Sequence, residues 1–217
     1  MSVCGSSRLR RAVHFVPGGN ERMLAKSLGL EADTLILDLE DAVTPDRKVE
    51  VRREVAGWLE ATDFGGKERA VRINDLMTPW GREDVEVRDE RGEYLDVFRY
   101  CRSMTLLAAR AGGAQPIDSV FTEIGDLDGL RLDCQRAAWM GFEGKMTIHP
   151  NQIPIVNEVF TPSEAEIASA AALVAAFAEN QARGRMAFRH EGQMVDAPHL
   201  HRAERVLDRA RQAGAIE

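Results

Sequence analysis

Short apolar runs alternate along this chain with longer stretches in which apolar residues recur at helical spacing. The clearest run is residues 34–40, where three leucines alternate with Ile36, Asp38 and Glu40. Because strand side chains point to opposite faces of a sheet in turn, one face of this run is leucine and the other becomes acidic as the strand ends. The pattern predicts a strand packed under a helix, with carboxylates at its carboxyl end.

The whole chain repeats this pattern of a strand followed by a helix. We predict strands at residues 13–17, 34–40, 69–74, 116–123 and 145–150, and helices at 20–28, 44–61, 92–111, 126–140, 161–181 and 198–213. Five such units in regular alternation predict a parallel sheet covered by helices. An eight-unit barrel needs about 250 residues, so the 217 residues hold five units and a C-terminal extension. We expect an α/β domain over residues 1–160 and a helical domain over 161–217.

Three helices carry more specific expectations. The helix at 126–140 is expected to be capped by Asp126 or Asp128, and the helix after residue 160 by a capping box of Thr161 and Glu164. The helix at 92–111 is expected to bury one stripe, formed by Leu95, Phe98, Cys101, Met104, Thr105 and Ala108.

Composition narrows the class of protein. Hydrophobic residues make up 44% and charged residues 29% of the chain, which is ordinary for a soluble globular protein. The formal net charge of −7 argues against nucleic acid or an anionic membrane as the main partner. The three cysteines fit neither a disulfide framework nor a zinc site. No apolar segment follows the basic residues at the start, and the longest apolar run, 168–178, is too short to span a bilayer. A cytoplasmic protein is expected.

Charged residues lie where parallel α/β folds place their chemistry, at the carboxyl ends of strands. Glu40 and Asp41 follow the second strand, and Arg72 lies within the third between two apolar residues. Arg72 can supply positive charge inside a barrel or form a structural ion pair with Asp38 or Glu40. Asp38, inside its strand, is expected to hold Arg72. Four of the five histidines show no spacing typical of metal ligands and are expected at the surface. They are His14, His190, His199 and His201.

A series of segments, in order along nearly the whole chain, matches one known family. The segments are Phe15–Gly18 with Lys26, Leu35–Val43 with Lys48, Val71–Asn74, Tyr94–Gly112, Ile117–Val120, Gly141–Lys145, Ile148–Ile153 and Met194–Pro198. Together they resemble the citrate lyase β-subunit-like family of acyl-CoA lyases, within the HpcH/HpaI aldolase superfamily. The resemblance implies a (β/α)8 barrel of the TIM type with a C-terminal helical lid.

The chain departs from that family after its third strand. In the family, three more strand–helix units follow, and they supply a glutamate and an aspartate that bind Mg²⁺ directly. Here residues 75–90 are turn-forming and charged residues with no strand pattern. Either a segment of about 80 to 90 residues, three units of a barrel, is omitted, or the protein is this short and leaves two sheet edges open.

The resemblance implies reversible carbon–carbon cleavage of a 3-hydroxyacyl thioester, in which an acetyl or propionyl thioester leaves as an enolate. Malyl-, citramalyl- or citryl-type thioesters are the implied substrates, and Mg²⁺ is the implied cofactor, acting as a Lewis acid. Two alternatives stay open. One is hydrolysis, as in a malyl-CoA-type thioesterase, and the other is a non-catalytic binding or assembly subunit without metal ligands.

The resemblance also implies roles for individual residues. Arg72 would lie beside the substrate oxygens. Glu40 and Asp41 would contact the metal through water, or they belong to a solvated loop that caps the helix beginning at Thr44. Asp196 would ride on the lid, reach a neighbouring subunit and serve in acid–base chemistry, or it is an ordinary N-cap of the last helix. Such a lid implies self-association as a trimer or hexamer. Four residues would line the CoA or substrate channel or form structural turns; they are Pro17, Gly18, His149 and Pro150.

Overall fold

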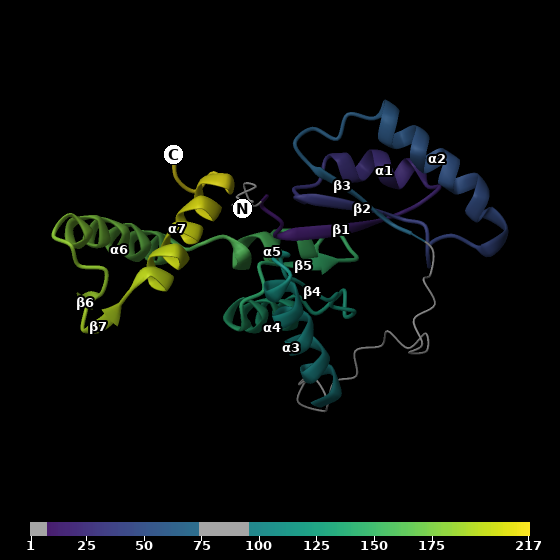
Figure 1. The fold of residues 1–217 in the computed structure, drawn as a ribbon. Coiled ribbons are helices and arrows are strands. Elements are labelled where there is room, and N and C mark those ends of the chain that lie inside the picture. Colours follow the sequence, from purple (N-terminus) through teal and green to yellow (C-terminus); the bar gives the residue numbers. More distant parts are fainter. Residues whose placement is uncertain (1–7, 74–95) are drawn as a thin grey trace. The chain divides into compact units, whose positions relative to one another are not determined.

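The computed structural model describes residues 8–73 and 96–217, and the chain divides into two compact units (Figure 1). The first unit, Arg10–Phe160, is α/β. The second contains Thr161–Glu217 and is mainly helical. The predicted charged connector at 75–90 lies outside the described residues.

In the first unit, the described residues form a five-stranded parallel sheet. Its strands are β1 (Ala12–Pro17), β2 (Thr34–Asp38), β3 (Glu68–Arg72), β4 (Ile117–Asp118) and β5 (Gly144–Thr147). Their order is β3-β2-β1-β5-β4, so the last strand pairs with the first as in a closing barrel. The described strands leave β3 and β4 at the two edges, on either side of the place where the sequence predicted missing units. The predicted parallel α/β fold is confirmed.

Five helices of this unit are described. They are α1 (Glu21–Leu28), α2 (Lys48–Ala61) after a 3-10 turn at Pro45–Arg47, α3 (Asp96–Ala111), α4 (Leu127–Met140) and α5 (Gln152–Phe160). The side chains of Leu35 and Leu37 in β2 are fully buried in the core, which also contains Val51 and Val55 of α2. The predicted leucine face under a helix is therefore confirmed.

Several predicted boundaries are wrong by a few residues. The strand predicted at 116–123 is regular only over Ile117–Asp118. The strand predicted at 145–150 ends at Thr147, because the side-chain oxygen of the buried Gln152 accepts hydrogen bonds from the N–H groups of Ile148 and His149. Asp126, not Asp128, caps α4 by accepting a hydrogen bond from the N–H of Gly129.

The rotation of α3 also differs from the prediction. Its exposed face includes the predicted core positions Cys101, Met104, Thr105 and Ala108, whereas Arg102 and Leu106 are half-buried. The reason is a set of ion pairs that turns Arg102 toward the sheet. The predicted buried stripe is therefore wrong at these four positions, and Leu95 and the side chain of Phe98 lie outside what the structure describes.

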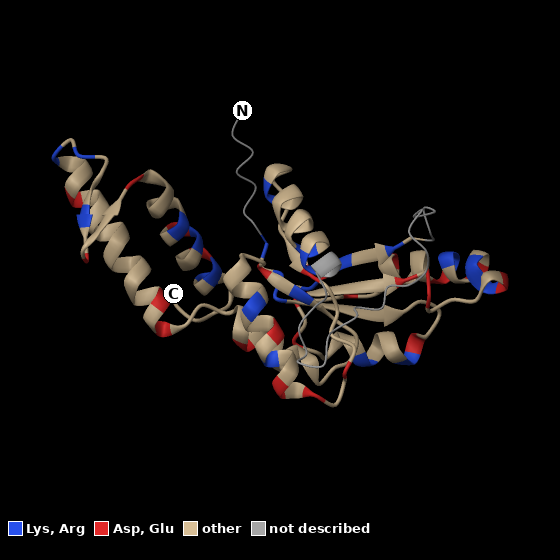
Figure 2. Cartoon of the chain, turned by 90° about the horizontal axis from the view of Figure 1, so that it is seen from below, with Lys and Arg blue, Asp and Glu red and all other residues tan. Residues whose placement is uncertain are grey.

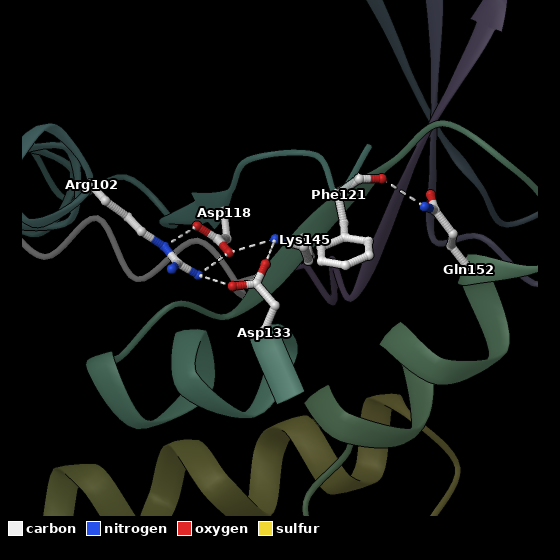
Figure 3. Close-up of polar contacts among 6 residues, drawn as sticks. All are labelled: Arg102, Asp118, Phe121, Asp133, Lys145 and Gln152. Carbon is white, nitrogen blue, oxygen red and sulfur yellow. Dashed lines mark hydrogen bonds and ion pairs between the residues drawn. The ribbon is translucent and has the colours of Figure 1, made fainter. Parts of the chain in front are cut away.

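That set of ion pairs lies buried between the sheet and the helices (Figure 3). The ammonium of Lys145 in β5 is fully buried, 2.8 Å from the carboxylate of Asp118 and 2.7 Å from that of Asp133. Arg102 donates two hydrogen bonds to Asp118, one from Nε at 2.7 Å. Burial alone would lower the pKa of Lys145, but the two carboxylates outweigh it and raise the pKa. The charges of Lys145 and Arg102 balance those of Asp118 and Asp133, and these ion pairs join α3 and α4 to the edge of the sheet.

The second unit contains α6 (Glu164–Ala182), α7 (Ala197–Gln212) and an antiparallel hairpin of β6 (Phe188–His190) and β7 (Gln193–Val195). Buried Ala170 of α6 packs in one cluster with Ala203 and Leu207 of α7. Figure 2 shows basic residues repeated along α7. The capping box of α6 is formed by Ser163 and Glu166, two residues later than predicted. No helix in the described part of the chain is long and apolar enough to cross a membrane.

Candidate active site

The carboxyl ends of β1 and β2 approach each other closely. The N–H of Gly18 donates a hydrogen bond of 2.9 Å to the carbonyl oxygen of Asp38. A Cβ atom on residue 18 would lie 2.4 Å from that oxygen, so only glycine allows the approach. The predicted turn at Pro17 and Gly18 is therefore held directly beside the end of β2.

Arg72 lies opposite Asp38 in the parallel register of β2 and β3. Its guanidinium donates from Nε to Oδ1 at 2.8 Å and from Nη2 to Oδ2 at 2.7 Å. The expectation that Asp38 holds Arg72 is confirmed. Glu40 and Asp41 contribute two further carboxylates, 3.1 Å and 2.9 Å from the guanidinium. The carboxyl ends of β2 and β3 thus bring together four of the residues singled out from the sequence: Asp38, Glu40, Asp41 and Arg72.

Electrostatics keep the pair of Asp38 and Arg72 ionised. Burial of Asp38 would raise its pKa, but the hydrogen bonds from Arg72 and from the backbone N–H groups of Glu40 and Ala42 outweigh burial and lower the pKa. Hydrogen bonding to Asp38 in turn raises the pKa of Arg72. Three carboxylates surround one guanidinium, so the group is negative overall and attracts cations.

The ring of Phe15 completes the surroundings of Arg72, with its centroid 5.0 Å from the guanidinium carbon. This cation–π contact was missed by the sequence reasoning. The register of the strands explains the contact, because Phe15 pairs with Ile36 and Pro17 with Asp38, which places Phe15 and Pro17 on the face of the sheet that carries Arg72.

His149 and Pro150 follow β5 and are exposed at the same edge of the sheet. Nδ1 of His149 lies 2.6 Å from the side-chain oxygen of Asn151. Because all strands are parallel, their carboxyl ends lie on the same side of the sheet. The structure therefore places His149 and Pro150 at the carboxyl end of the sheet, as it does Pro17, Gly18 and Arg72.

Asp196 belongs to the second unit, where it is the N-cap residue of α7. Its carboxylate lies 2.6 Å from Nδ1 of His199, and its backbone N–H points to the same nitrogen at 3.4 Å. The N-cap position expected as an alternative is thus confirmed. A catalytic role of Asp196 stays a prediction.

His14 was predicted at the surface, and this is wrong. Its side chain lies on the helix-facing side of β1 with Ala12 and Val16, and only 5% of the residue is exposed. Nδ1 lies 2.9 Å from Oγ1 of Thr147. Burial, and to a lesser degree the charge of His149, lower the pKa of His14 to about 4. His14 is a neutral core residue at physiological pH.

The described residues do not fit a complete magnesium site. Mg²⁺ prefers six oxygen ligands in a near-octahedral arrangement, and no group of three His, Cys, Asp or Glu side chains suited to a metal occurs within residues 8–73 and 96–217. Glu40 and Asp41 both lie against Arg72, which leaves them suited to contact a hydrated ion through water. The direct ligands implied by the resemblance are not among the residues that the structure describes.

Comparison with known proteins identifies the family. Two family sequence models match in succession, HpcH/HpaI aldolase/citrate lyase over residues 11–94 and a carbon–carbon bond lyase of the TIM-barrel fold over residues 97–215. A (3S)-malyl-CoA thioesterase of Cereibacter sphaeroides is 32% identical, with 95% of this chain and 96% of the relative covered. The chain belongs to the HpcH/HpaI aldolase/citrate lyase family.

Other relatives of this HpcH/HpaI protein agree with that assignment. The mitochondrial citramalyl-CoA lyase of Rattus norvegicus is 31% identical over 91% of this chain and 85% of the relative. Protein CitE of Mycobacterium tuberculosis, solved with magnesium, acetoacetate and coenzyme A, superposes with a TM-score of 0.68 at 27% identity, covering 96% of this chain and 100% of that one. The predicted family and its TIM-barrel-like fold are therefore confirmed.

The length of the alignment bears on the missing units. The alignment with the thioesterase runs over 274 positions, whereas 95% of 217 residues is about 206. About 68 positions of the relative thus stand opposite gaps in this HpcH/HpaI chain. The shortfall agrees with the absence of strands between β3 and β4 in the described part of the sheet.

Proposed function

We propose that this protein is an acyl-CoA carbon–carbon lyase that acts on a malyl-, citramalyl- or citryl-type thioester. The observation that carries the proposal is the guanidinium of Arg72, fixed by Asp38 at the carboxyl edge of the sheet, beside the turn at Pro17 and Gly18. Carbon–carbon cleavage next to a thioester develops negative charge on oxygen. A guanidinium oriented before the substrate arrives stabilises such charge without further reorganisation, provided that a bound cation offsets the charges of Glu40 and Asp41.

The other residues at this edge have supporting roles in the proposal. Pro17, Gly18, His149 and Pro150 line the channel for the CoA thioester. Asp196, carried on the lid of a neighbouring subunit in a trimer or hexamer, supplies the proton that the enolate needs. In the balanced reaction the substrate hydroxyl loses its proton, one carbon–carbon bond of the substrate breaks, and the acyl-CoA enolate that leaves is protonated.

We further propose that activity requires Mg²⁺, with Glu40 and Asp41 in contact with it through water. The support is that CitE of Mycobacterium tuberculosis was solved with magnesium. Because the described residues do not fit a complete site, no step of the reaction is assigned to the metal.

The experiment is incubation of the purified protein with malyl-CoA, citramalyl-CoA or citryl-CoA, with Mg²⁺ or with EDTA, followed by chromatography of the CoA products. Cleavage of malyl-CoA releases acetyl-CoA and glyoxylate. Formation of acetyl-CoA only when Mg²⁺ is present supports the proposal. Unchanged substrates under both conditions contradict it and favour a non-catalytic binding subunit.

Hydrolysis of the thioester is the second candidate function. It is favoured by the 32% identity to a (3S)-malyl-CoA thioesterase. In this case water replaces CoA on the acyl carbon, so malate and free CoA appear without acetyl-CoA. The same chromatogram therefore separates the two activities.

A further inference from the structure

Two loops at the carboxyl end of the sheet leave neighbouring strands. One loop, residues 119–126, connects β4 to α4, and the other, residues 148–151, connects β5 to α5. The two strands pair directly. Loops at this end of a parallel α/β barrel carry the groups that bind substrate, and the second loop contains His149 and Pro150. A side chain that fixes both loops therefore shapes the site.

Gln152, the first residue of α5, is such a side chain. Only 1% of the residue is exposed. Its Oε1 accepts hydrogen bonds from the N–H groups of Ile148 at 2.9 Å and His149 at 3.3 Å. Its Nε2 donates to the carbonyl oxygen of Phe121 at 2.8 Å, a contact that Figure 3 shows. One buried amide thus joins the loop after β4 to the loop after β5.

The amide at residue 152 does more than fill space. Burying an amide costs free energy unless its hydrogen bonds are made. The other large buried side chains of α5 are apolar, so packing of the helix is served by an apolar residue; they are Ile153, Val156 and Phe160. What the amide adds is one defined arrangement of the two loops, because these hydrogen bonds go to the backbone of both.

Asn151 fixes the ring of His149. Its Nδ2 donates to the carbonyl oxygen of Ile124 at 3.1 Å, so its Oδ1 is the atom that faces Nδ1 of His149 at 2.6 Å. Two lone pairs would repel at this distance, so Nδ1 carries a proton and donates the hydrogen bond. In the neutral ring the lone pair then lies on Nε2. Because His149 is exposed, this nitrogen can accept a hydrogen bond from a ligand.

We propose that Asn151 and Gln152 are positioning residues of the channel for the CoA thioester, and that Nε2 of His149 accepts a hydrogen bond from an amide N–H of the pantetheine arm. The inference rests on the proposed function, because it takes a CoA thioester as the ligand. The pantetheine arm is a flexible chain whose polar groups include amides. A few polar groups that the protein holds in place orient such a ligand.

Asn157 provides a matched control on the same helix. It is 8% exposed, and its Nδ2 donates to the carbonyl oxygen of Glu31 at 2.7 Å. Glu31 precedes β2, which places this bond at the amino end of the sheet, away from the two loops. Gln152→Leu and Asn157→Leu each remove a buried amide from α5. A purely structural role of Gln152 predicts equal effects of the two variants on the binding of CoA.

Hydrogen–deuterium exchange of the ligand-free proteins tests the positioning of the loops. We expect Gln152→Leu to raise the exchange rate of backbone N–H groups in residues 119–126 and 148–151 by about tenfold, since both loops lose buried hydrogen bonds. Asn157→Leu should leave these rates unchanged. Wild-type rates in both loops of Gln152→Leu overturn the positioning role. Asn151→Ala is the second variant, because Asn151 is exposed and its removal leaves the core intact.

Calorimetry tests the hydrogen bond to the ligand. The probes are CoA and adenosine bisphosphate, the part of CoA that lacks the pantetheine arm. We expect His149→Phe, Asn151→Ala and Gln152→Leu to weaken the binding of CoA by about tenfold, the effect of one lost hydrogen bond, and to leave the binding of adenosine bisphosphate unchanged. Asn157→Leu should bind both probes like the wild type. Wild-type affinity for CoA in Asn151→Ala and His149→Phe, or equal losses for both probes, overturns the proposal.

Neither measurement depends on turnover. A wild-type protein that binds CoA but leaves malyl-CoA intact would contradict the proposed activity alone. Variants of Asn151 and Gln152 that cleave malyl-CoA with the wild-type KM, and bind CoA as tightly as the wild type, would overturn this inference alone.

Discussion

The guanidinium of Arg72 faces both oxygens of Asp38 across two neighbouring parallel strands, with contacts of 2.8 Å and 2.7 Å. This bidentate pair orients the arginine before any substrate binds. The side chain of Arg72 is nevertheless 30% exposed, so it remains within reach of a ligand. A fixed and reachable cation is what the proposed reaction needs.

We predict that Arg72→Ala lowers kcat/KM for malyl-CoA cleavage by about 10² to 10³, the loss typical of removing one group that stabilises a developing oxyanion. Arg72→Lys restores the charge but not the two-pronged geometry, so its activity stays well below that of the wild type. Steady-state kinetics with thermal melting checks both. Arg69→Ala is the control, because Arg69 lies on the same strand and points to the opposite face. Unchanged turnover of Arg72→Ala would remove Arg72 from the mechanism.

We predict that Asp196→Asn abolishes turnover but leaves the binding of CoA and the melting temperature nearly unchanged. The amide keeps the shape of the side chain but cannot accept and return a proton. His199→Ala is the matched variant, since it removes the neighbour of the carboxylate at 2.6 Å and leaves the carboxylate itself. If Asp196→Asn lowers only the melting temperature, the residue is an N-cap without a catalytic role.

We predict that His14 makes the fold sensitive to mild acid. Its folded-state pKa is about 4, below the ordinary value of 6.5, so the unfolded chain binds more protons between these values. The stability that neutral His14 contributes is complete above pH 6.5 and is lost as the pH falls toward 4. The full change amounts to about 3 kcal/mol.

Urea unfolding at a series of pH values tests this expectation. His14→Gln keeps a polar group near Thr147 but cannot titrate, so its free energy of unfolding should vary less between pH 6.5 and 4. His201→Gln changes a histidine whose side chain is 72% exposed and should leave the wild-type slope unaltered. Equal slopes for all three proteins would show that His14 does not govern the acid sensitivity.

We predict that Lys145→Met destabilises the protein by about 3 to 5 kcal/mol, because it leaves two buried carboxylates that share the single charge of Arg102. Arg131→Ala breaks an exposed ion pair with Glu158 and should destabilise the protein far less, because solvent screens that pair. Chemical denaturation of both variants measures the difference. A similar small loss in both would show that the buried ion pairs of Lys145 stabilise the fold no more than the exposed pair does.

The errors of the sequence analysis have physical causes. The apolar stripe on α3 looked like a core face, because apolar spacing alone cannot show which side of a helix has neighbours. The rotation of α3 is decided by Arg102, whose partners Asp118 and Asp133 are 16 and 31 residues away along the chain. His14 looked like a surface residue, because its partner Thr147 comes from a strand near the other end of the α/β unit.

Local patterns were enough for the strand at Thr34–Asp38 and for the carboxylates at strand ends, and they narrowed the cap of α4 to Asp126 or Asp128, because period and capping depend on neighbours in sequence. The sequence by itself therefore determined the parallel α/β class, and it indicated the family and an ion pair of Arg72 with a carboxylate of the second strand. Only the tertiary structure decided that Lys145 and His14 are buried, that three carboxylates gather on Arg72, and that the described sheet has two open edges. These features depend on contacts between strands and helices far apart in the chain, which no local period encodes.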